Sequence, residues 1–489
     1  MSRRYLIYGG AVILGVMLGS LLFLWRSNAL VQVWGQPPNK VEPRQVLEPL
    51  DPLFPSPDKT SYTMALSLDV EHLTLVGRTH IKTVNTSGGR LNQLWLTAYP
   101  NIFRHKDITP VPITAYEGNF APGYLEFTGA YVNGKAVVVG NQNVSVQLDL
   151  GEAIKPDAPV EVDLAWILHL PPVAYRLGYQ QGVFMLGNFY PSLEMYNRQG
   201  WHHSPEVKFG DPFCFAAADY TVALTVPGGY QVVAGADLIN RLSDDRGMET
   251  WVFASNRARD FAFAAFLPGF NMEKRQVGNI EVQVWGKSQA ALASTANVAA
   301  KVLSYYQEIF TPFPHKQLKL VEVPMQGFMG MEYDGLIFLS DRAMSASYSP
   351  EQRSHLVAHE IAHQWWYALV GNDQALEPWL DEGLSSWSAQ LYARKQGEAV
   401  GSAKQSSRQM AWPLTAFTSR EQYMTAVYNG GDWFWQQVEN QVGQPKLLRG
   451  LQAYLQACAG QVASTGDMFS ALMQAGVDRD VLYSCWQRR

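Results

Sequence analysis

The spacing of hydrophobic residues changes near residue 270, and this change limits the folds open to the chain. Before it, hydrophobic and polar residues alternate repeatedly, as in Val160, Val162, Leu164 and Trp166. A period of two is typical of strands that bury one face. Residues 60–270 are therefore predicted to form an all-β domain of antiparallel strands. Three further runs alternate in the same way: Leu66, Leu68, Val70; Val144, Val146, Leu148, Leu150; Tyr220, Val222, Leu224, Val226.

Beyond residue 270 the pattern becomes mainly helical. Residues 288–310 are rich in Ala and other helix formers and end before Pro312 and Pro314, which predicts a long helix. A strand-like run, LKLVEVP, follows, and helical periodicity extends from about Pro350 to the C-terminus. Residues 271–489 are therefore predicted to form a mixed, mainly helical second domain.

The N-terminus carries an uncharged apolar run. Residues 5–25 contain no Asp, Glu, Lys or Arg and are long enough to cross a bilayer as a helix. Arg3 and Arg4 favour a cytoplasmic tail at residues 1–4, which places the rest of the chain outside the cytoplasm, in the periplasm or the extracellular space. The alternatives are a signal peptide cleaved after Ala29 and a twin-arginine export signal.

Residues 26–59 are predicted to be a linker, because seven prolines between residues 37 and 58 exclude a continuous helix or a central strand. The remaining 430 positions, in a chain with 47% hydrophobic residues, suffice for large cores. The net charge is −5 and no Lys/Arg-rich block occurs, so nucleic acid is not an expected partner. Three cysteines, Cys214, Cys458 and Cys485, are interpreted as separate buried thiols, with a Cys458–Cys485 disulfide as the alternative.

The clearest chemical signal is the segment HEIAH at residues 359–363. His359 and His363 are four positions apart, so in a helix their imidazoles lie on one face and converge on one ion. Two imidazoles suit Zn²⁺, which takes three protein ligands and one water when it is catalytic. The alternative is a surface helix that happens to carry two histidines.

A third ligand is expected in a second helical segment that begins near Trp379. Glu382 lies 19 positions after His363, far enough for a loop and a helix start to return its carboxylate to the ion. Asp381 and Glu377 are competing acids, because spacing alone does not give the phase of this helix.

These motifs resemble the gluzincin zinc aminopeptidases of the aminopeptidase N type. The resemblance rests on His359-Glu360-Xaa-Xaa-His363, on Glu382 after a gap of eighteen residues, and on the order of a β-domain before the metal domain. It covers roughly residues 60–489 and implies an N-terminal β saddle or sandwich followed by a thermolysin-like catalytic domain. It also indicates a short, membrane-anchored bacterial type without the family's C-terminal domains.

The resemblance implies a role for each site residue. One Zn²⁺ would be held by His359, His363 and Glu382, with Glu360 as general base and then acid. Tyr428 would stabilise the oxyanion, with Tyr423 as a nearby competitor. The substrate would be a peptide with a free N-terminus. The family's substrate-lining segment, which would line its binding site, here reads Gly330, Met331 and Glu332.

Glu332 is expected to bind the substrate's α-ammonium, against the alternative of a solvated turn carboxylate. The chain departs from the family at Met329 and Tyr333, where Gly and Asn are usual, and at Gly430, where Lys is usual. We expect these departures to affect the substrate specificity. Two other functions remain open: a zinc endopeptidase with the same chemistry, and a catalytically silent, membrane-tethered binding module.

Overall fold

The computed structural model describes residues 60–197, 200–398 and 408–488 of the 489-residue chain. The predicted tail (1–4), membrane helix (5–25) and linker (26–59) therefore lie outside the described residues. Within the described ranges, no helix combines the length and hydrophobicity needed to span a bilayer.

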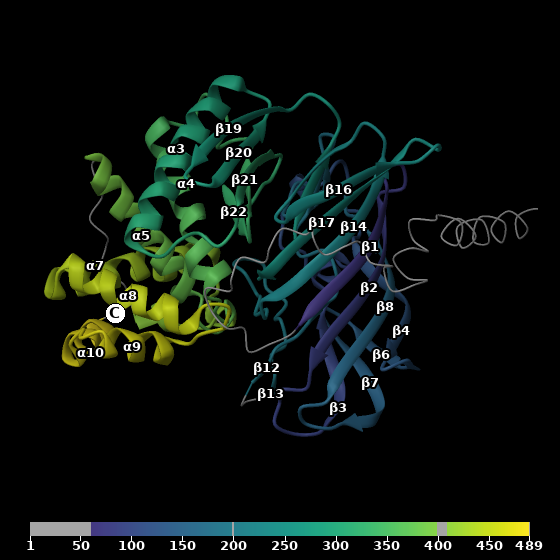
Figure 1. Ribbon diagram of the computed structural model, residues 1–489, viewed down its shortest axis with the longest axis horizontal. Helices are drawn as coiled ribbons and strands as arrows, with labels where there is room; N and C mark the ends of the chain where they lie inside the picture. The colour runs from purple at the N-terminus through teal and green to yellow at the C-terminus, as the bar shows by residue number, and fades with distance from the viewer. Residues whose placement is uncertain (1–59, 198–199, 399–407, 489) are drawn as a thin grey trace, which may run out of the picture. The chain divides into compact units, whose positions relative to one another are not determined.

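The first half of the described chain is built from strands (Figure 1). Its largest sheet has eight strands, in the order β16 (Asp237–Ser243), β17 (Met248–Ala258), β14 (Ala218–Pro227), β1 (Ser61–Asp69), β2 (Thr74–Val84), β8 (Pro159–His169), β4 (Tyr124–Val132) and β5 (Lys135–Ala136). Two four-stranded sheets and a short hairpin complete this half: β11 (Ser192–Leu193), β3 (Leu91–Thr97), β7 (Ser145–Ile154), β6 (Val138–Gln142); β15 (Gln231–Ala234), β18 (Phe263–Phe266), β10 (Val183–Leu186), β9 (Leu177–Gln180); β12 (Tyr196–Asn197), β13 (Gly200–Trp201).

The alternating runs form strands of the expected kind, with one difference in pairing. In β8, Val160, Val162, Leu164 and Trp166 are buried, as the period of two predicts. The prediction that all strands pair antiparallel is wrong for β1, which pairs parallel with β14. A parallel pair needs a long crossover connection, and strands β2 to β13 provide one.

The second half contains a five-stranded mixed sheet and most of the helices. The sheet runs in the order β19 (Asn271–Val277), β20 (Ile280–Gly286), β21 (Gln317–Val323), β23 (Leu336–Ser340) and β22 (Gly330–Tyr333). The helices are α3 (Gln289–Ile309), α4 (Pro350–Ala362), α5 (Trp379–Gln396), α6 (Arg420–Met424), α7 (Gly430–Val442), α8 (Gln444–Cys458), α9 (Thr465–Gln474) and α10 (Arg479–Arg488). The long helix predicted over 288–310 is α3, and the predicted fold class is confirmed.

The two halves share an apolar core. Met185 and Val233 on the β side are buried in one cluster with Val321, Met331 and Phe338 from the mixed sheet. This core places strand β22 against the β domain. The preferred interpretation of the cysteines, three separate thiols, is confirmed: none forms a disulfide, although one of the three is only half-buried.

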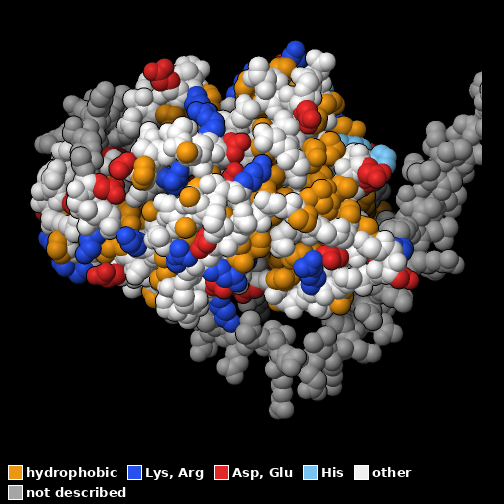
Figure 2. Space-filling view, turned by 90° about the horizontal axis from the view of Figure 1, so that it is seen from above, with side chains coloured by type: hydrophobic (Ala, Val, Ile, Leu, Met, Phe, Trp, Pro, Cys, Tyr) orange, Lys and Arg blue, Asp and Glu red, His pale blue; other side chains and the backbone are white. Residues whose placement is uncertain are grey.

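The surface of the β half is partly apolar. Figure 2 shows hydrophobic side chains gathered over part of the molecule, away from the regions where charged side chains are mixed with polar ones. The edge strand β16 exposes Leu238, Ile239 and Leu242. This exposed edge belongs to the β domain and not to the helices that carry the histidines.

Candidate metal centre

Helix α4 brings His359 and His363 together. The helix begins after Ser349, whose side chain accepts a hydrogen bond from the Gln352 backbone N–H in a capping box, with Pro350 at the first helical position. It ends at Ala362, so His359 lies in its last turn and His363 is its C-cap residue. Their Nε2 atoms are 3.1 Å apart. The Nδ1 of His363 lies 3.3 Å from the Trp366 carbonyl oxygen, which orients that ring.

Glu382 completes a triangle of donor atoms from the first turn of α5. Its Oε2 lies 3.1 Å from His359 Nε2 and 3.4 Å from His363 Nε2. Metal–ligand bonds of 2.0–2.1 Å in a tetrahedral zinc site place neighbouring donors about 3.3–3.4 Å apart. The three side chains therefore fit a small tetrahedral cation.

The two competing acids have other partners. The Asp381 carboxylate accepts hydrogen bonds from the side-chain amides of Asn372 (2.9 Å) and Gln374 (2.7 Å). Glu377 accepts hydrogen bonds from the backbone and the hydroxyl of Thr465. The structure thus selects Glu382 from the three acids that spacing allowed.

Glu360 is buried beside this triangle, and its Oε2 has no hydrogen-bond partner. Strand β22 approaches it closely: a Cβ atom on Gly330 would lie 2.2 Å from the Glu360 carboxyl carbon, so any larger residue there would displace the carboxylate. Burial, together with the nearby Glu382 charge, raises the pKa of Glu360 to about 8. A bound cation would act in the opposite direction. An unpaired carboxylate next to metal donors can accept a proton from a metal-bound water.

Tyr428 reaches the triangle from the π-helical segment Thr425–Asn429 between α6 and α7. Its hydroxyl donates a hydrogen bond to Glu382, and its ring stacks on His359 with centroids 5.7 Å apart. The competitor Tyr423 packs edge-on against Tyr428 instead. Of the two tyrosines, Tyr428 is the one that contacts the donor cluster.

Two glycines allow this approach. A Cβ on Gly431 would lie 2.4 Å from the Gly383 Cα, so α7 and α5 touch backbone to backbone at this point. Gly431 is the glycine three positions after Tyr428, and Gly383 follows Glu382 directly. The close contact sets the distance between the tyrosine and the glutamate.

Gly330, Met331 and Glu332 lie in β22, on the side of the mixed sheet next to α4. Met331 packs in the apolar core between the two halves, and Glu332 is only 6% exposed. The alternative of a solvated turn carboxylate is therefore wrong, because a strand and not a turn carries Glu332. Burial raises the pKa of Glu332 well above its ordinary value, and His363 partly opposes this.

The β domain adds a residue that the sequence did not reveal. Asp211 offers a carboxylate oxygen that lies within 4.8 Å of carboxylate oxygens of Glu332 and Glu382. Arg176, fully buried, donates a hydrogen bond to Asp211 and holds it in place. Neither residue belongs to a motif. Arg176 directly precedes β9 and Asp211 lies between β13 and β14, so both are more than a hundred residues before the histidines. No local pattern could have indicated them.

A family model matches the half of the chain that carries this cluster. Residues 294–486 match the model of the Peptidase family M1 domain. This segment includes α4, α5 and Tyr428, so all members of the donor triangle lie inside it.

Curated relatives are similar over part of their length. The chain is 24% identical over 248 residues to aminopeptidase M1-B of Oryza sativa subsp. japonica, covering 46% of this chain and 28% of the relative. It is 24% identical over 286 residues to human glutamyl aminopeptidase, covering 53% and 30%. The alignments thus span less than a third of these relatives.

Solved structures share the fold. The M1 zinc metallopeptidase of Deinococcus radiodurans has a TM-score of 0.62 at 16% identity, covering 88% of this chain and 93% of that one. A mutant form bound to a Tyr-Ser-Ala substrate has a TM-score of 0.62 at 15% identity, covering 88% and 95%. At this identity the likeness shows the fold, in which both the β half and the helical half take part.

Proposed function

We propose that this chain is a zinc-dependent aminopeptidase, which hydrolyses the N-terminal peptide bond of peptides. The observation that carries the proposal is the triangle of His359, His363 and Glu382 with the unpaired carboxylate of Glu360 beside it. The relatives named above as aminopeptidases and as a zinc metallopeptidase support the same activity.

His359, His363 and Glu382 would hold one Zn²⁺, whose donor set of two imidazoles and a carboxylate is typical of catalytic zinc. When bound, zinc lowers the pKa of a coordinated water and polarises a carbonyl group. Glu360 accepts the proton of the attacking water at its free Oε2 and delivers it to the leaving amine. Gly330 leaves the space in which this carboxylate lies.

Tyr428 donates its hydroxyl to the oxygen that becomes negative during attack. It is hydrogen-bonded to Glu382 in the structure, so its hydroxyl is already beside the donor cluster. A single well-placed donor of this kind contributes about 3–4 kcal/mol to transition-state stabilisation.

Glu332 and Asp211 bind the α-ammonium of the substrate. Two carboxylates buried near each other repel, and a bound cation removes that cost. Arg176 holds Asp211, which leaves Glu332 as the carboxylate without a fixed cationic partner of its own. A positive charge at this place sets cleavage one residue from the end of the peptide.

The test compares one peptide with its N-acetylated form on the purified full chain. We expect zinc at the triangle and cleavage of the free peptide only. Equal cleavage of both forms would replace the aminopeptidase with an endopeptidase. Absence of both zinc and cleavage would leave a membrane-tethered binding module.

Two variants separate the roles of the carboxylates. Glu360→Gln should lower turnover by about 10²–10⁴-fold with zinc retained, because the base is lost and the ligands are not. Glu332→Gln should raise KM for the free peptide and reduce the discrimination against the acetylated form. If Glu332→Gln lowers turnover and leaves discrimination intact, Glu332 does not bind the ammonium.

We also propose that the chain is anchored in a membrane by residues 5–25, with its catalytic domain outside the cytoplasm. The uncharged run and Arg3 and Arg4 support this orientation. Fractionation of cells that express the full chain, followed by N-terminal sequencing, tests it. An intact N-terminus in the membrane fraction is expected, whereas a soluble product that begins near residue 30 would indicate a cleaved signal peptide.

A further inference from the structure

A second group of metal-donor side chains lies in the described part of the chain and shares no residue with the first. It consists of His202, Cys214 and Asp373, whose donor atoms all lie within 4.8 Å of one another. His202 follows the β12–β13 hairpin, Cys214 precedes strand β14, and Asp373 lies in the loop before α5. The group thus joins two segments of the β domain to the catalytic half.

One atom in this group lacks the partner that a buried polar atom needs. The His202 side chain is only 7% exposed, and its Nδ1 lies 2.8 Å from Asp373 Oδ2. Its Nε2 is buried and has no hydrogen-bond partner. An unsatisfied buried nitrogen costs about 1–3 kcal/mol, so its presence calls for a ligand or another explanation.

The Asp373 side chain and the His202 backbone are held in place independently of any ion. The other oxygen of Asp373, Oδ1, accepts hydrogen bonds from the backbone N–H groups of Ala375 (3.1 Å) and Leu376 (2.9 Å). The backbone N–H of His202 donates to the Met195 carbonyl at 2.8 Å. Cys214 is buried, with 5% of its surface exposed. A site with fixed donors loses little entropy when it binds a metal.

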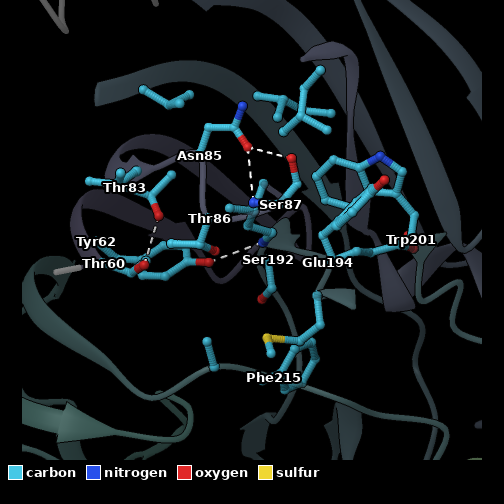
Figure 3. A pocket seen from close by; sticks show the side chains of 18 of the residues that line it. Thr60, Tyr62, Thr83, Asn85, Thr86, Ser87, Ser192, Glu194, Trp201 and Phe215 are labelled. Carbon is cyan, nitrogen blue, oxygen red and sulfur yellow. Dashed lines mark hydrogen bonds between the residues drawn. The ribbon is translucent and has the colours of Figure 1, made fainter. Parts of the chain in front are cut away.

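Two hollows adjoin the group. His202 and Leu376 line a hollow of about 250 Å³, large enough for water molecules. Trp201 and Phe215, the neighbours of His202 and Cys214, line a cavity of about 80 Å³ on the β side, which Figure 3 shows. Of the three members of the group, His202 is the one that lines this first hollow.

We propose that His202, Cys214 and Asp373 form a second metal site, selective for a borderline-soft divalent ion such as Zn²⁺. A thiolate, an imidazole and a carboxylate are all zinc ligands, whereas a thiolate disfavours Mg²⁺ and Ca²⁺. On binding, the Cys214 thiol releases its proton to solvent and the sulfur becomes a ligand. A water molecule would complete the coordination of such an ion.

A metal at this site would stabilise the loop around Asp373, which supports the first cluster. Asn372 and Gln374, on either side of Asp373, both donate hydrogen bonds to Asp381, the residue before Glu382. A metal on Asp373 therefore fixes the loop to His202 and Cys214 of the β domain. Its role is structural, since no substrate group is needed to complete it.

Cobalt substitution tests the proposal. The full chain is stripped with a chelator and titrated with Co²⁺, and metal content and the absorption spectrum are recorded. A thiolate ligand produces a near-ultraviolet sulfur-to-cobalt charge-transfer band, which the nitrogen and oxygen donors of the first cluster do not produce. We expect two cobalt ions per chain and this band in the wild type.

Matched variants assign the band. Cys214→Ser should lose the band and one of the two metal ions, whereas Cys458→Ser, which alters a half-buried thiol outside the group, should keep both. A wild-type chain that binds one ion without the band would overturn the proposal, and so would a band that persists in Cys214→Ser. If Cys214→Ser does not fold, the wild-type spectrum and His202→Gln decide the question in the same way. Because peptide hydrolysis is not the readout, this test is independent of the proposed aminopeptidase activity.

Discussion

The cluster of His359, His363 and Glu382 and the cluster of His202, Cys214 and Asp373 each bring three donor side chains together, but by different routes. The first lies at the ends of two helices, with His359 in the last turn of α4, His363 as its C-cap residue, and Glu382 in the first turn of α5. The second gathers three loop or loop-edge residues, from position 202 to position 373. Its members meet only because the β domain packs against the catalytic half.

The two clusters therefore differ in origin: local helix geometry brings the donors of the first together, and packing between the two halves brings the donors of the second together. A helix holds positions i and i+4 on one face in any protein, so the first cluster is encoded in a short segment. The second depends on long-range contacts that have no period in the sequence. The following predictions test whether the two clusters are independent, in order of decreasing expected effect.

The largest effect is expected for His363→Ala. Loss of one of three ligands should remove the metal from the first cluster and reduce peptide hydrolysis below detection. Metal content should fall from two ions to one, and the cobalt charge-transfer band should remain. Disappearance of the band in this variant would show that the clusters are coupled.

Tyr428→Phe should lower kcat by about 10²–10³-fold, because one donor to the oxyanion is lost. Both metal ions should remain bound, since the hydroxyl is not a ligand. Tyr423→Phe is the matched control, as that ring packs on Tyr428 without contacting Glu382 through a hydrogen bond of its own. A larger loss of kcat in the control would reverse the assignment of the two tyrosines.

Gly431→Ala should destabilise the chain by about 1–3 kcal/mol, because the added Cβ would lie 2.4 Å from the Gly383 Cα. For a domain of 150–250 residues each 1 kcal/mol lowers Tm by about 2–4 °C. Thermal unfolding of the zinc-loaded chain measures this shift, and kcat should fall with it as Tyr428 moves relative to Glu382.

Gly466→Ala is the control for that helix–helix contact, since its added Cβ meets only the Ser464 Oγ at 3.5 Å. It should leave kcat unchanged and should not lower Tm, because Ala is a better helix former than Gly. The cobalt band should be present in both glycine variants, because neither position lies in the second cluster. An unchanged Tm in Gly431→Ala would mean that α5 and α7 can move apart without loss of folding stability.

The smallest effect is expected for Asp373→Asn. The side chain can still accept the Ala375 and Leu376 N–H groups at Oδ1, so the loop should keep its shape. The second ion should bind more weakly, because the amide carries no charge. At a metal concentration of 100 Kd a ligand stabilises the folded state by about 2.7 kcal/mol, and this metal-dependent rise in Tm should be reduced in the variant. An undiminished rise would exclude Asp373 as a ligand.

Much of the fold could be predicted from hydrophobic spacing. The period of two located β1, β7, β8 and β14, and the Ala-rich segment became α3 with ends within one residue of those expected. The pairing of β1 with β14 could not be predicted, because strand order depends on which apolar faces cover each other and not on the residues of either strand.

For the candidate site, the sequence identified the side chains and the structure decided their arrangement. Spacing left three acids for the third ligand, and hydrogen bonds from Asn372, Gln374 and Thr465 engage two of them. Spacing also left Glu332 as a solvated alternative, which the burial of β22 excludes. Asp211 carries no sequence signal, since Arg176 holds it across from Glu332 by a contact between distant segments.

The sequence by itself determined the β-to-helix order of the chain and the pair of histidines with its adjacent glutamate. These features arise from residues a few positions apart, whose relative placement is fixed by the backbone geometry of a strand or a helix. Only the tertiary structure decided which acid faces the histidines, how deeply Glu332 is buried, and that His202, Cys214 and Asp373 meet. Those outcomes depend on the packing of two cores against each other. The hydrophobic effect that drives this packing is non-directional and roughly proportional to the buried area, so the packing leaves no local pattern in the sequence.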